Sequence, residues 1–238
     1  MDKVDLVIRV AKQEDVKRLV LIDKVAWGEE MAAGEEKLNS RIGIYPQGQL
    51  VATIDDEIYG FMNAQRTGKD DFDARYSNGR GTWPAMSDDG YIRDTHKPNG
   101  LSLFLINLSV LPDVHELGYQ RIDVGHALVS GMRGLAQSEG LERIEGITRV
   151  DGFVNWLNKK YRYDGLPEDK KKDLERKKIN EYISEVVNKV SSGRGTVRDP
   201  SLEFHLRQVA DPRLIIPIEN AMPCDHASAL WGAYFRYR

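Results

Sequence analysis

The stretch that decides the fold lies near the middle of the chain, where residues 107–112 read Asn-Leu-Ser-Val-Leu-Pro and residues 120–128 read Gln-Arg-Ile-Asp-Val-Gly-His-Ala-Leu. The first part ends a nearly continuous apolar run, 101–110, which predicts a strand in the middle of a sheet. An apolar stripe over 124–137 predicts a helix. A polar loop between strand and helix leaves free backbone N–H groups at the helix start, and such groups can hold a diphosphate.

The N-terminal side of this stretch predicts a strand, two helices and a hairpin. In order, these are the strand 6–10, helices over 13–25 and 35–42, and the paired strands 49–54 and 58–64. The following segment, about 66–100, is polar and rich in Gly, Asp and aromatic residues, with no clear period. We expect an irregular insertion there, because long ordered loops are uncommon and often line binding sites.

The C-terminal side predicts strands and helices around a helical, highly charged insertion at about 160–195. Within the insertion, 164–178 mixes both signs of charge, which is typical of a solvated loop and helix face, and 179–190 has the spacing of an amphipathic helix. Asp199 can cap a short helix with Pro200 at its first position. Strands are expected at 143–148, 215–218 and 232–237.

Length, charge and cysteine content narrow the class of protein. The 238 residues are 41% hydrophobic, enough for one large α/β domain over 1–238. The net charge of -3 gives no basic field, so we expect neither a nucleic-acid nor a membrane partner. The single cysteine, Cys224, cannot form an internal disulfide, and its surroundings lack metal-site spacing, so no metal is expected. With no signal-like apolar stretch at the start, these features predict a cytoplasmic protein.

The central stretch resembles the GNAT superfamily of N-acetyltransferases. Their signature is a strand ending in a Val-x-Pro-like step, then Gln/Arg-x-x-Gly-x-Gly/Ala and a helix. Gln120 and Gly125 match their places, whereas Asp123 stands where the first glycine belongs. An acidic side chain beside a diphosphate is unfavourable unless it points outward. The C-terminal third, from about 181, is also similar to a GNAT subgroup found fused to carbon-nitrogen hydrolases.

The resemblance implies a GNAT-like α/β (α+β) fold with a central mixed, twisted sheet of about seven strands flanked by helices. The co-substrate would be acetyl-CoA or another acyl-CoA, with its pantetheine arm along the strand at 108–110 and its pyrophosphate at 120–125. The alternative for Gly125 is close packing of a helix on a sheet. The implied cofactor-binding residues are Leu108, Ser109, Val110, Gln120, Arg121, Ile122, Asp123, Val124, Gly125 and His126.

The implied reaction is direct acyl transfer, in a ternary complex, to the amine of a small molecule or peptide. The catalytic residues stay unassigned, because Asn107 stands where many relatives carry an acid and a water-mediated base is then expected. Tyr161 or Tyr163 could protonate the departing thiolate, and the alternative for each is an ordinary packed or exposed tyrosine. His205 is interpreted as a hydrogen-bonded structural histidine.

Three further questions are left open by the sequence. Four aromatic residues could wall an acceptor pocket, with ordinary packing as the alternative for each: Trp27, Trp83, Tyr91 and Trp231. A non-catalytic acyl-CoA sensor or partner domain, and a synthase using a longer acyl donor, are the alternatives to acetyl transfer. A homodimer is compatible with everything above.

Overall fold

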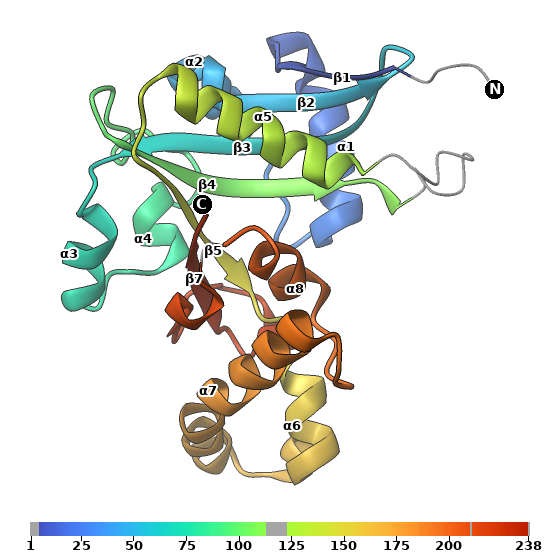
Figure 1. The fold of residues 1–238 in the computed structure, drawn as a ribbon, viewed down its shortest axis with the longest axis vertical. Helices are drawn as coiled ribbons and strands as arrows, with labels where there is room; N and C mark the ends of the chain where they lie inside the picture. Colours follow the sequence, from blue (N-terminus) through green and yellow to red (C-terminus); the bar gives the residue numbers. More distant parts are fainter. Residues whose placement is uncertain (1–4, 113–122, 210, 238) are drawn as a thin grey trace. The chain divides into compact units, whose positions relative to one another are not determined.

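The computed structural model of the chain describes residues 5–112, 123–209 and 211–237 (Figure 1). Its strands are β1 (Leu6–Val10), β2 (Gln49–Ile54), β3 (Glu57–Thr67), β4 (Ser102–Val110), β5 (Arg143–Arg149), β6 (Ile216–Ile218) and β7 (Gly232–Arg236). Its α-helices are α1 (Val16–Trp27), α2 (Glu35–Ile44), α3 (Asp71–Ser77), α4 (Trp83–Ser87), α5 (Val124–Ser138), α6 (Phe153–Tyr161), α7 (Glu168–Ser192) and α8 (Pro200–Leu206).

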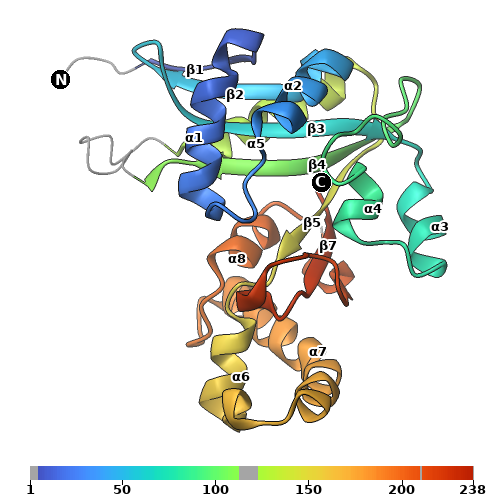
Figure 2. The same ribbon diagram turned by 180° about the vertical axis from the view of Figure 1, so that it is seen from behind.

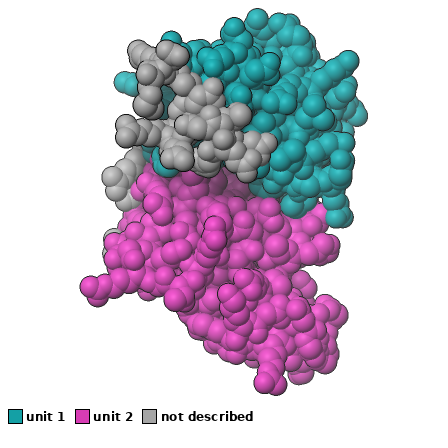
Figure 3. All heavy atoms as spheres, turned by 90° about the vertical axis from the view of Figure 1, so that its right-hand side faces the viewer, with its two compact units in different colours: residues 1–75, 84–144 teal, residues 76–83, 145–238 magenta. Residues whose placement is uncertain are grey.

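The seven strands form a mixed sheet in the order β1-β2-β3-β4-β5-β7-β6. The predicted fold class, a central sheet of about seven strands flanked by helices, is therefore confirmed. The chain divides into two compact units, which Figure 3 colours separately. Unit 1 comprises residues 1–75 and 84–144, and unit 2 comprises residues 76–83 and 145–238.

Unit 1 is an antiparallel meander of β1 to β4 with helices on both faces. Each strand pairs with the next, for example Leu6 with Ile54 and Thr67 with Ser102. Figure 2 shows α1 and α2 in front of these strands, and Figure 1, the opposite view, shows α5 in front of them. All residues of β2 are buried, as expected of a strand covered on both faces.

The two faces of the unit 1 sheet pack in different ways. Apolar residues of α1 at helical spacing, such as Leu19 and Ile22, join Phe61 of β3 in one buried cluster. On the other face α5 approaches closely at Gly131, where a Cβ atom would lie 2.9 Å from Ile8 Cγ2 and 3.0 Å from Leu50 Cδ1. Glycine at this position therefore lets the helix backbone lie almost directly on β1 and β2.

A register shift interrupts the pairing of β3 and β4 near the predicted site. Asn63 pairs with Asn107, but the next residue, Ala64, pairs with Leu105. Ile106 is thus an extra residue on β4, which makes a β-bulge. Bulges bend a strand and re-aim its side chains, so the end of β4 from Asn107 onward is oriented independently of its start.

The segment expected to be irregular, 66–100, is partly regular. It includes the end of β3 and the short helices α3 and α4, and the remainder is mostly turns. In this segment the non-glycine residues Asp88, Asp89 and Ile92 adopt positive φ angles of 52°, 49° and 61°. The segment consists mainly of tight turns and of two helices of one to two turns each. Such short elements do not produce a hydrophobic period that could be recognised in the sequence.

Unit 2 contains β5, β7 and β6, paired antiparallel in that order from Glu145 onward, together with α6, α7 and α8. Helix α7 begins at Glu168, well before the apolar stripe that starts at Ile179. Ion pairs at i,i+3, such as Glu168 with Lys171, accompany this charged first part. The segment 168–178 is therefore helix throughout, where a solvated loop and helix face was expected.

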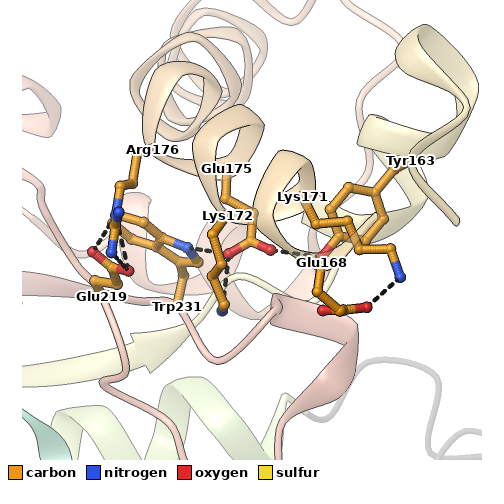
Figure 4. A network of polar contacts seen from close by, with 8 residues as sticks. All are labelled: Tyr163, Glu168, Lys171, Lys172, Glu175, Arg176, Glu219 and Trp231. Carbon is orange, nitrogen blue, oxygen red and sulfur yellow. Dashed lines mark hydrogen bonds and ion pairs between the residues drawn. The ribbon is translucent and has the colours of Figure 1, made fainter. Parts of the chain in front are cut away.

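A buried carboxylate holds the start of α7 to the rest of unit 2. Glu175 is 1% exposed, and it accepts hydrogen bonds from Tyr163 Oη at 2.6 Å and from Trp231 Nε1 at 3.2 Å (Figure 4). Lys172 adds an ion pair at 3.2 Å. The charge is thus compensated and both oxygens are bonded, which a buried carboxylate requires.

The short helix α8 begins as the sequence predicts. The Asp199 carboxylate accepts a hydrogen bond from Leu202 N at 2.9 Å, and Pro200 occupies the first helical position. In the described part of the chain, none of the helices is both long and apolar enough to span a membrane.

Candidate functional site

The start of α5 and the end of β4 are brought together at Gly60 of β3. A Cβ atom at this glycine would lie 2.8 Å from Val124 Cγ1, 2.9 Å from Ser109 O and 3.1 Å from Val110 Cγ2. The first residue of the helix therefore rests on the strand pair at the point where β4 ends. Both described parts of the predicted site, 108–110 and 123–126, belong to unit 1 and meet here.

The side chains at the end of β4 alternate between the two faces of the sheet. Leu108 and Val110 are half-buried, and the Val110 side chain lies near Val124 around Gly60. Asn107 and Ser109 point to the opposite face, where both side chains contact Asp23 of α1. The end of this strand thus presents apolar side chains toward α5 and polar ones toward α1.

Asp123, which replaces the first glycine of the signature, is the N-cap of α5. Its Oδ1 accepts from His126 N at 2.9 Å, and its Oδ2 lies 2.5 Å from His126 Nδ1. Both side chains are exposed, Asp123 to 61% and His126 to 47%. The carboxylate therefore satisfies one of the free amides of the helix start, the role of a good N-cap, and it does so where a diphosphate was predicted to bind.

The structure describes residues 108–110 and 123–126 of the predicted site. Gln120, Arg121 and Ile122 lie outside the described residues. Val124 is buried against Gly60, and Gly125 is buried beside it. His126 is a surface residue paired with Asp123.

A buried polar group behind β4 was missed by the sequence reasoning. We call Asp23, Trp27, Asn107 and Ser109 the Asp23 cluster. Asp23, on α1, is 1% exposed, and its Oδ1 accepts from Asn107 Nδ2 at 2.7 Å and from Ser109 Oγ at 2.5 Å. Its Oδ2 accepts from the backbone of Ala33 at 2.6 Å, and Trp27 Nε1 donates to Ser109 Oγ at 2.8 Å.

A buried cation lies in the neighbouring part of the same face. Arg41 of α2 is 1% exposed, and it donates from Nη1 to Asn63 Oδ1 at 2.8 Å and from Nε to Gly90 O at 2.6 Å. Burial lowers the pKa of Arg41 to about 10, and the charges of Asp23 and Asp89 oppose that shift. Asn63 is the β3 partner of Asn107, so the cation and the Asp23 cluster flank one strand pair.

The tyrosines considered as acids occupy structural positions in unit 2. Tyr163 is buried and donates to Glu175, and burial together with that carboxylate raises its pKa well above the ordinary value. Tyr161 lies at the end of α6, with its hydroxyl 3.5 Å from Glu181. The raised pKa makes Tyr163 a poorer acid. Tyr161 contacts only residues of unit 2 in the interactions described, so neither tyrosine is assigned this role.

His205 is a buried, hydrogen-bonded histidine, as interpreted from the sequence. Its Nδ1 lies 2.7 Å from Tyr237 Oη, and its ring stacks on Phe235 with centroids 4.2 Å apart. Burial lowers its pKa to about 3, so the ring is neutral at physiological pH. Cys224 is exposed, with a positive φ of 65°.

Specific contacts can be given for three of the aromatic residues considered for an acceptor pocket. Trp27 belongs to the Asp23 cluster, and Trp231 donates to Glu175. The Tyr91 ring lies beneath Arg93, whose Cζ is 4.3 Å from the ring centroid. Of the three, Trp27 alone contacts a residue of the predicted site.

The fold of this chain is that of GNAT-like domains. The loading GNATL domain of CurA from Lyngbya majuscula superposes with a TM-score of 0.67 at 19% identity, covering 98% of this chain and 97% of that domain. The GphF GNAT-like decarboxylase, solved in complex with isobutyryl-CoA, gives a TM-score of 0.62 at 21% identity, covering 97% of this chain and 98% of that one. At these identities the likeness establishes the architecture.

Two curated proteins of Bacillus subtilis (strain 168) are similar in sequence. The probable hydrolase YhcX is 27% identical over 233 residues, which cover 98% of this chain and 38% of that protein. The uncharacterized N-acetyltransferase YkwB is 29% identical over 117 residues, 48% of this chain and 49% of that protein. The chain thus spans less than half the length of either relative. No protein-family model matches the sequence.

Proposed function

We propose that the chain is an acyl-CoA-dependent N-acyltransferase that passes an acetyl or related acyl group to the amine of a small molecule or peptide. The observation that carries the proposal is the seating of the start of α5 on the end of β4 at Gly60. This places a helix N-terminus, which favours anions, beside the strand segment 108–110. The GNAT-like fold and the similarity to a protein named as an N-acetyltransferase support it.

The described residues fit an acyl-CoA in part. The backbone of Leu108 to Val110 would bind the pantetheine arm, and the amides of Val124 and Gly125 would face the diphosphate. When bound, the acyl-CoA supplies an activated thioester carbonyl. The protein's contribution would be to orient that carbonyl and the amine, since positioning accounts for much of the rate of such transfers. Asp123 opposes this fit, because its carboxylate already occupies the amide of His126.

A second candidate is decarboxylation of a carboxylated acyl-CoA. It is favoured by the extent of the structural likeness, because the GphF decarboxylase matches this chain almost end to end, unit 2 included. The binding residues would be the same as for acyl transfer. The two candidates differ in the fate of the acyl group.

The test separates binding from chemistry. Calorimetry would compare CoA with pantetheine, and we expect CoA to bind at least tenfold more tightly because only CoA carries the diphosphate. Thiol release would then be followed with acetyl-CoA and L-lysine, spermidine or a tripeptide, and CO₂ release with malonyl-CoA. Transfer to an amine supports the proposal, and CO₂ release without it favours the second candidate. Failure of CoA to bind would overturn both, whereas binding without either reaction would indicate the non-catalytic acyl-CoA sensor.

A further inference from the structure

The Asp23 cluster joins three parts of unit 1 at one carboxylate. Asp23 projects from α1, accepts a hydrogen bond from Ala33 in the segment between α1 and α2, and accepts two more from Asn107 and Ser109 of β4. The two β4 residues lie just after the bulge and flank Leu108. The cluster therefore lies directly behind the strand segment proposed to carry the pantetheine arm.

The carboxylate determines the orientation of the Asn107 side chain. A carboxylate oxygen accepts hydrogen bonds but donates none, so the amide of Asn107 has to present Nδ2, not Oδ1, to Asp23. Asn107 Oδ1 then lies 3.1 Å from Ser109 Oγ. Asn107 is half-buried, whereas Asp23 and Ser109 are buried. Asn107 is thus the member of this group of three through which the buried carboxylate can affect a bound substrate.

The hydroxyl of Ser109 is held from two sides. It donates to Asp23 Oδ1, and it accepts from the indole N–H of Trp27. The rotation of this hydroxyl is therefore fixed, and the Trp27 indole N–H reports on it through its hydrogen bond to Ser109 Oγ. A movement of the β4 backbone at residues 108–110 would therefore change the hydrogen bond of the Trp27 indole N–H.

We propose that Asp23 is a positioning residue of the transfer site, which fixes the Asn107 amide and the Ser109 hydroxyl at the reacting end of β4. This inference rests on the proposed function, because it takes 108–110 as the place where the thioester lies. Asp23 is buried and acts through the half-buried Asn107, without touching the substrate.

Two variants of the cluster make the inference testable. In D23N, one end of the new amide carries N–H groups, so Asn107 loses its fixed orientation or Ala33 N–H loses its acceptor. In the double variant D23N/N107D, the amide at position 23 can accept from Ala33 and donate to a carboxylate on β4, which also accepts from Ser109. The hydrogen bonds and the net charge of the cluster are thereby restored with the carboxylate moved to the strand.

A matched control lies in the same unit. Asp15 is also a largely buried carboxylate, 8% exposed, and it accepts from Arg9 at 2.7 Å and from Lys12 N at 2.8 Å. These two partners, Arg9 and Lys12, lie outside the Asp23 cluster. D15N therefore measures the effect of losing a buried carboxylate as such.

The test combines steady-state kinetics of the variants with NMR of the Trp27 indole. With acetyl-CoA and the amine that gives the highest turnover, we expect D23N to lower kcat at least tenfold, D23N/N107D to recover most of it, and D15N to change it less than twofold. The dissociation constant for CoA should stay within twofold in all three. In a ¹⁵N spectrum the four tryptophans give four indole signals. The indole signal that is missing from the spectrum of W27F belongs to Trp27. In the wild type this signal should shift when acetyl-CoA is added.

Each outcome decides the question. If D23N loses no more kcat than D15N, if the double variant recovers nothing while remaining folded, or if the Trp27 signal does not respond to bound acetyl-CoA, Asp23 has only a structural role. Absence of both CoA binding and turnover in the wild type would instead remove the proposed function, and this inference with it. Binding and turnover with an unaffected D23N would remove the inference alone.

Discussion

Asp123 stabilises the start of α5 but is expected to weaken the binding of an anionic ligand there. As the N-cap of α5 it accepts the His126 amide, and its negative charge stabilises the positive end of the helix dipole. The same charge lies where the proposed diphosphate would bind. The stability of the helix start and the affinity for acyl-CoA therefore place opposite demands on this position.

Neutralising Asp123 is expected to strengthen CoA binding. In D123N the amide oxygen still caps α5, since asparagine is as good an N-cap as aspartate, but the repulsion of the diphosphate is gone. We expect CoA to bind about fivefold more tightly, or about 1 kcal/mol at a solvent-exposed site. Calorimetry at low and high salt measures this, because the gain should shrink as salt screens the charges.

The control for D123N is E142Q, which removes an acid beyond the other end of α5, where Glu142 pairs with Lys69. Its affinity for CoA should equal that of the wild type. Equal affinity in D123N as well would mean that the diphosphate lies away from the start of α5.

A buried acid beside a half-buried one in unit 2 predicts a pH-dependent stability. Burial, and next the neighbouring Asp151, raise the pKa of Asp199 from 3.8 to about 8, although Tyr182 donates to it at 2.6 Å. Because the folded state holds this proton more tightly than the unfolded chain, its stabilising effect is complete below about pH 4. It is lost as the pH rises toward and through 8.

We therefore expect the melting temperature of the wild type to fall between pH 6.5 and 8.5, and that of D199N to fall less. An amide at position 199 can still cap α8 and cannot ionise. Differential scanning calorimetry checks the prediction, with the exposed Asp164 changed in D164N as the control that should follow the wild type. Parallel curves for D199N and the wild type would show that Asp199 does not titrate in this range.

Three elements of unit 1, β3, β4 and α5, converge at Gly60. In G60A the new methyl group would lie within 3 Å of Val124 and of the Ser109 carbonyl, so the start of α5 has to move outward. We expect a loss of about 1–3 kcal/mol in the free energy of unfolding, together with weaker CoA binding. Urea unfolding and calorimetry measure the two effects.

Gly43 of α2 is the matched control for Gly60, because a Cβ atom there would meet nothing within 4 Å. G43A should raise stability by about 0.5–1 kcal/mol through helix propensity and leave CoA binding unchanged. If G60A behaved like G43A, the seating of α5 on β4 would not be as close as described.

The attachment of α7 depends on Glu175. In E175A the Trp231 indole N–H and the Tyr163 hydroxyl lose a buried acceptor, so we expect the free energy of unfolding to fall by about 3 kcal/mol (Figure 4). Glu168, in the first turn of the same helix, is 82% exposed and pairs only with Lys171 among the described residues. E168A should therefore leave the urea midpoint close to that of the wild type.

Elements with a strong hydrophobic period could be predicted from the sequence to within a few residues. Strand β1 coincides with its predicted range, 6–10, and α5 begins at the predicted Val124. Helix α6 was missed, although Phe153, Trp156 and Leu157 have helical spacing and become its buried face. Helices α3 and α4 are too short for a period to form. The first half of α7 lacks apolar residues at regular spacing, so its helical state depends on charge pairs and on Glu175.

The candidate site could be predicted in position but not in its polar interior. Strand, proline, loop and helix locate the end of β4 and the start of α5 along the chain. Asp23 lies among Lys and apolar residues on an amphipathic helix, where an acid is expected to face solvent. It is buried only because Asn107 and Ser109, more than 80 residues later, supply the donors. A contact over that distance leaves no mark in local periodicity.

At the scale of the whole molecule, the proposed site belongs to one of two compact units. Acyl-CoA binding should therefore protect β4 and the start of α5 from hydrogen exchange while leaving α7 of unit 2 at its unliganded rate. Exchange mass spectrometry with and without CoA, on peptides from 102–110, 124–138 and 168–192, tests this. Protection confined to α7 would place the ligand elsewhere.

The structural matches and the sequence matches differ in how much of each protein they cover. GNAT-like domains match this chain almost end to end, yet it spans 38% of YhcX and 49% of YkwB. The architecture is thus shared as a whole by solved GNAT-like domains, while the matched residues make up less than half of either curated relative.

Unit 2 is assembled from two separated pieces of the chain, residues 76–83 and 145–238. A ribosome delivers the first piece before the second, so residues 76–83 lack their contacts within unit 2 until 145–238 have been synthesised. Synthesis order therefore favours a nascent chain in which unit 1 closes first. The excursion 76–83 is then the place where an interrupted translation product would expose surface to chaperones and proteases.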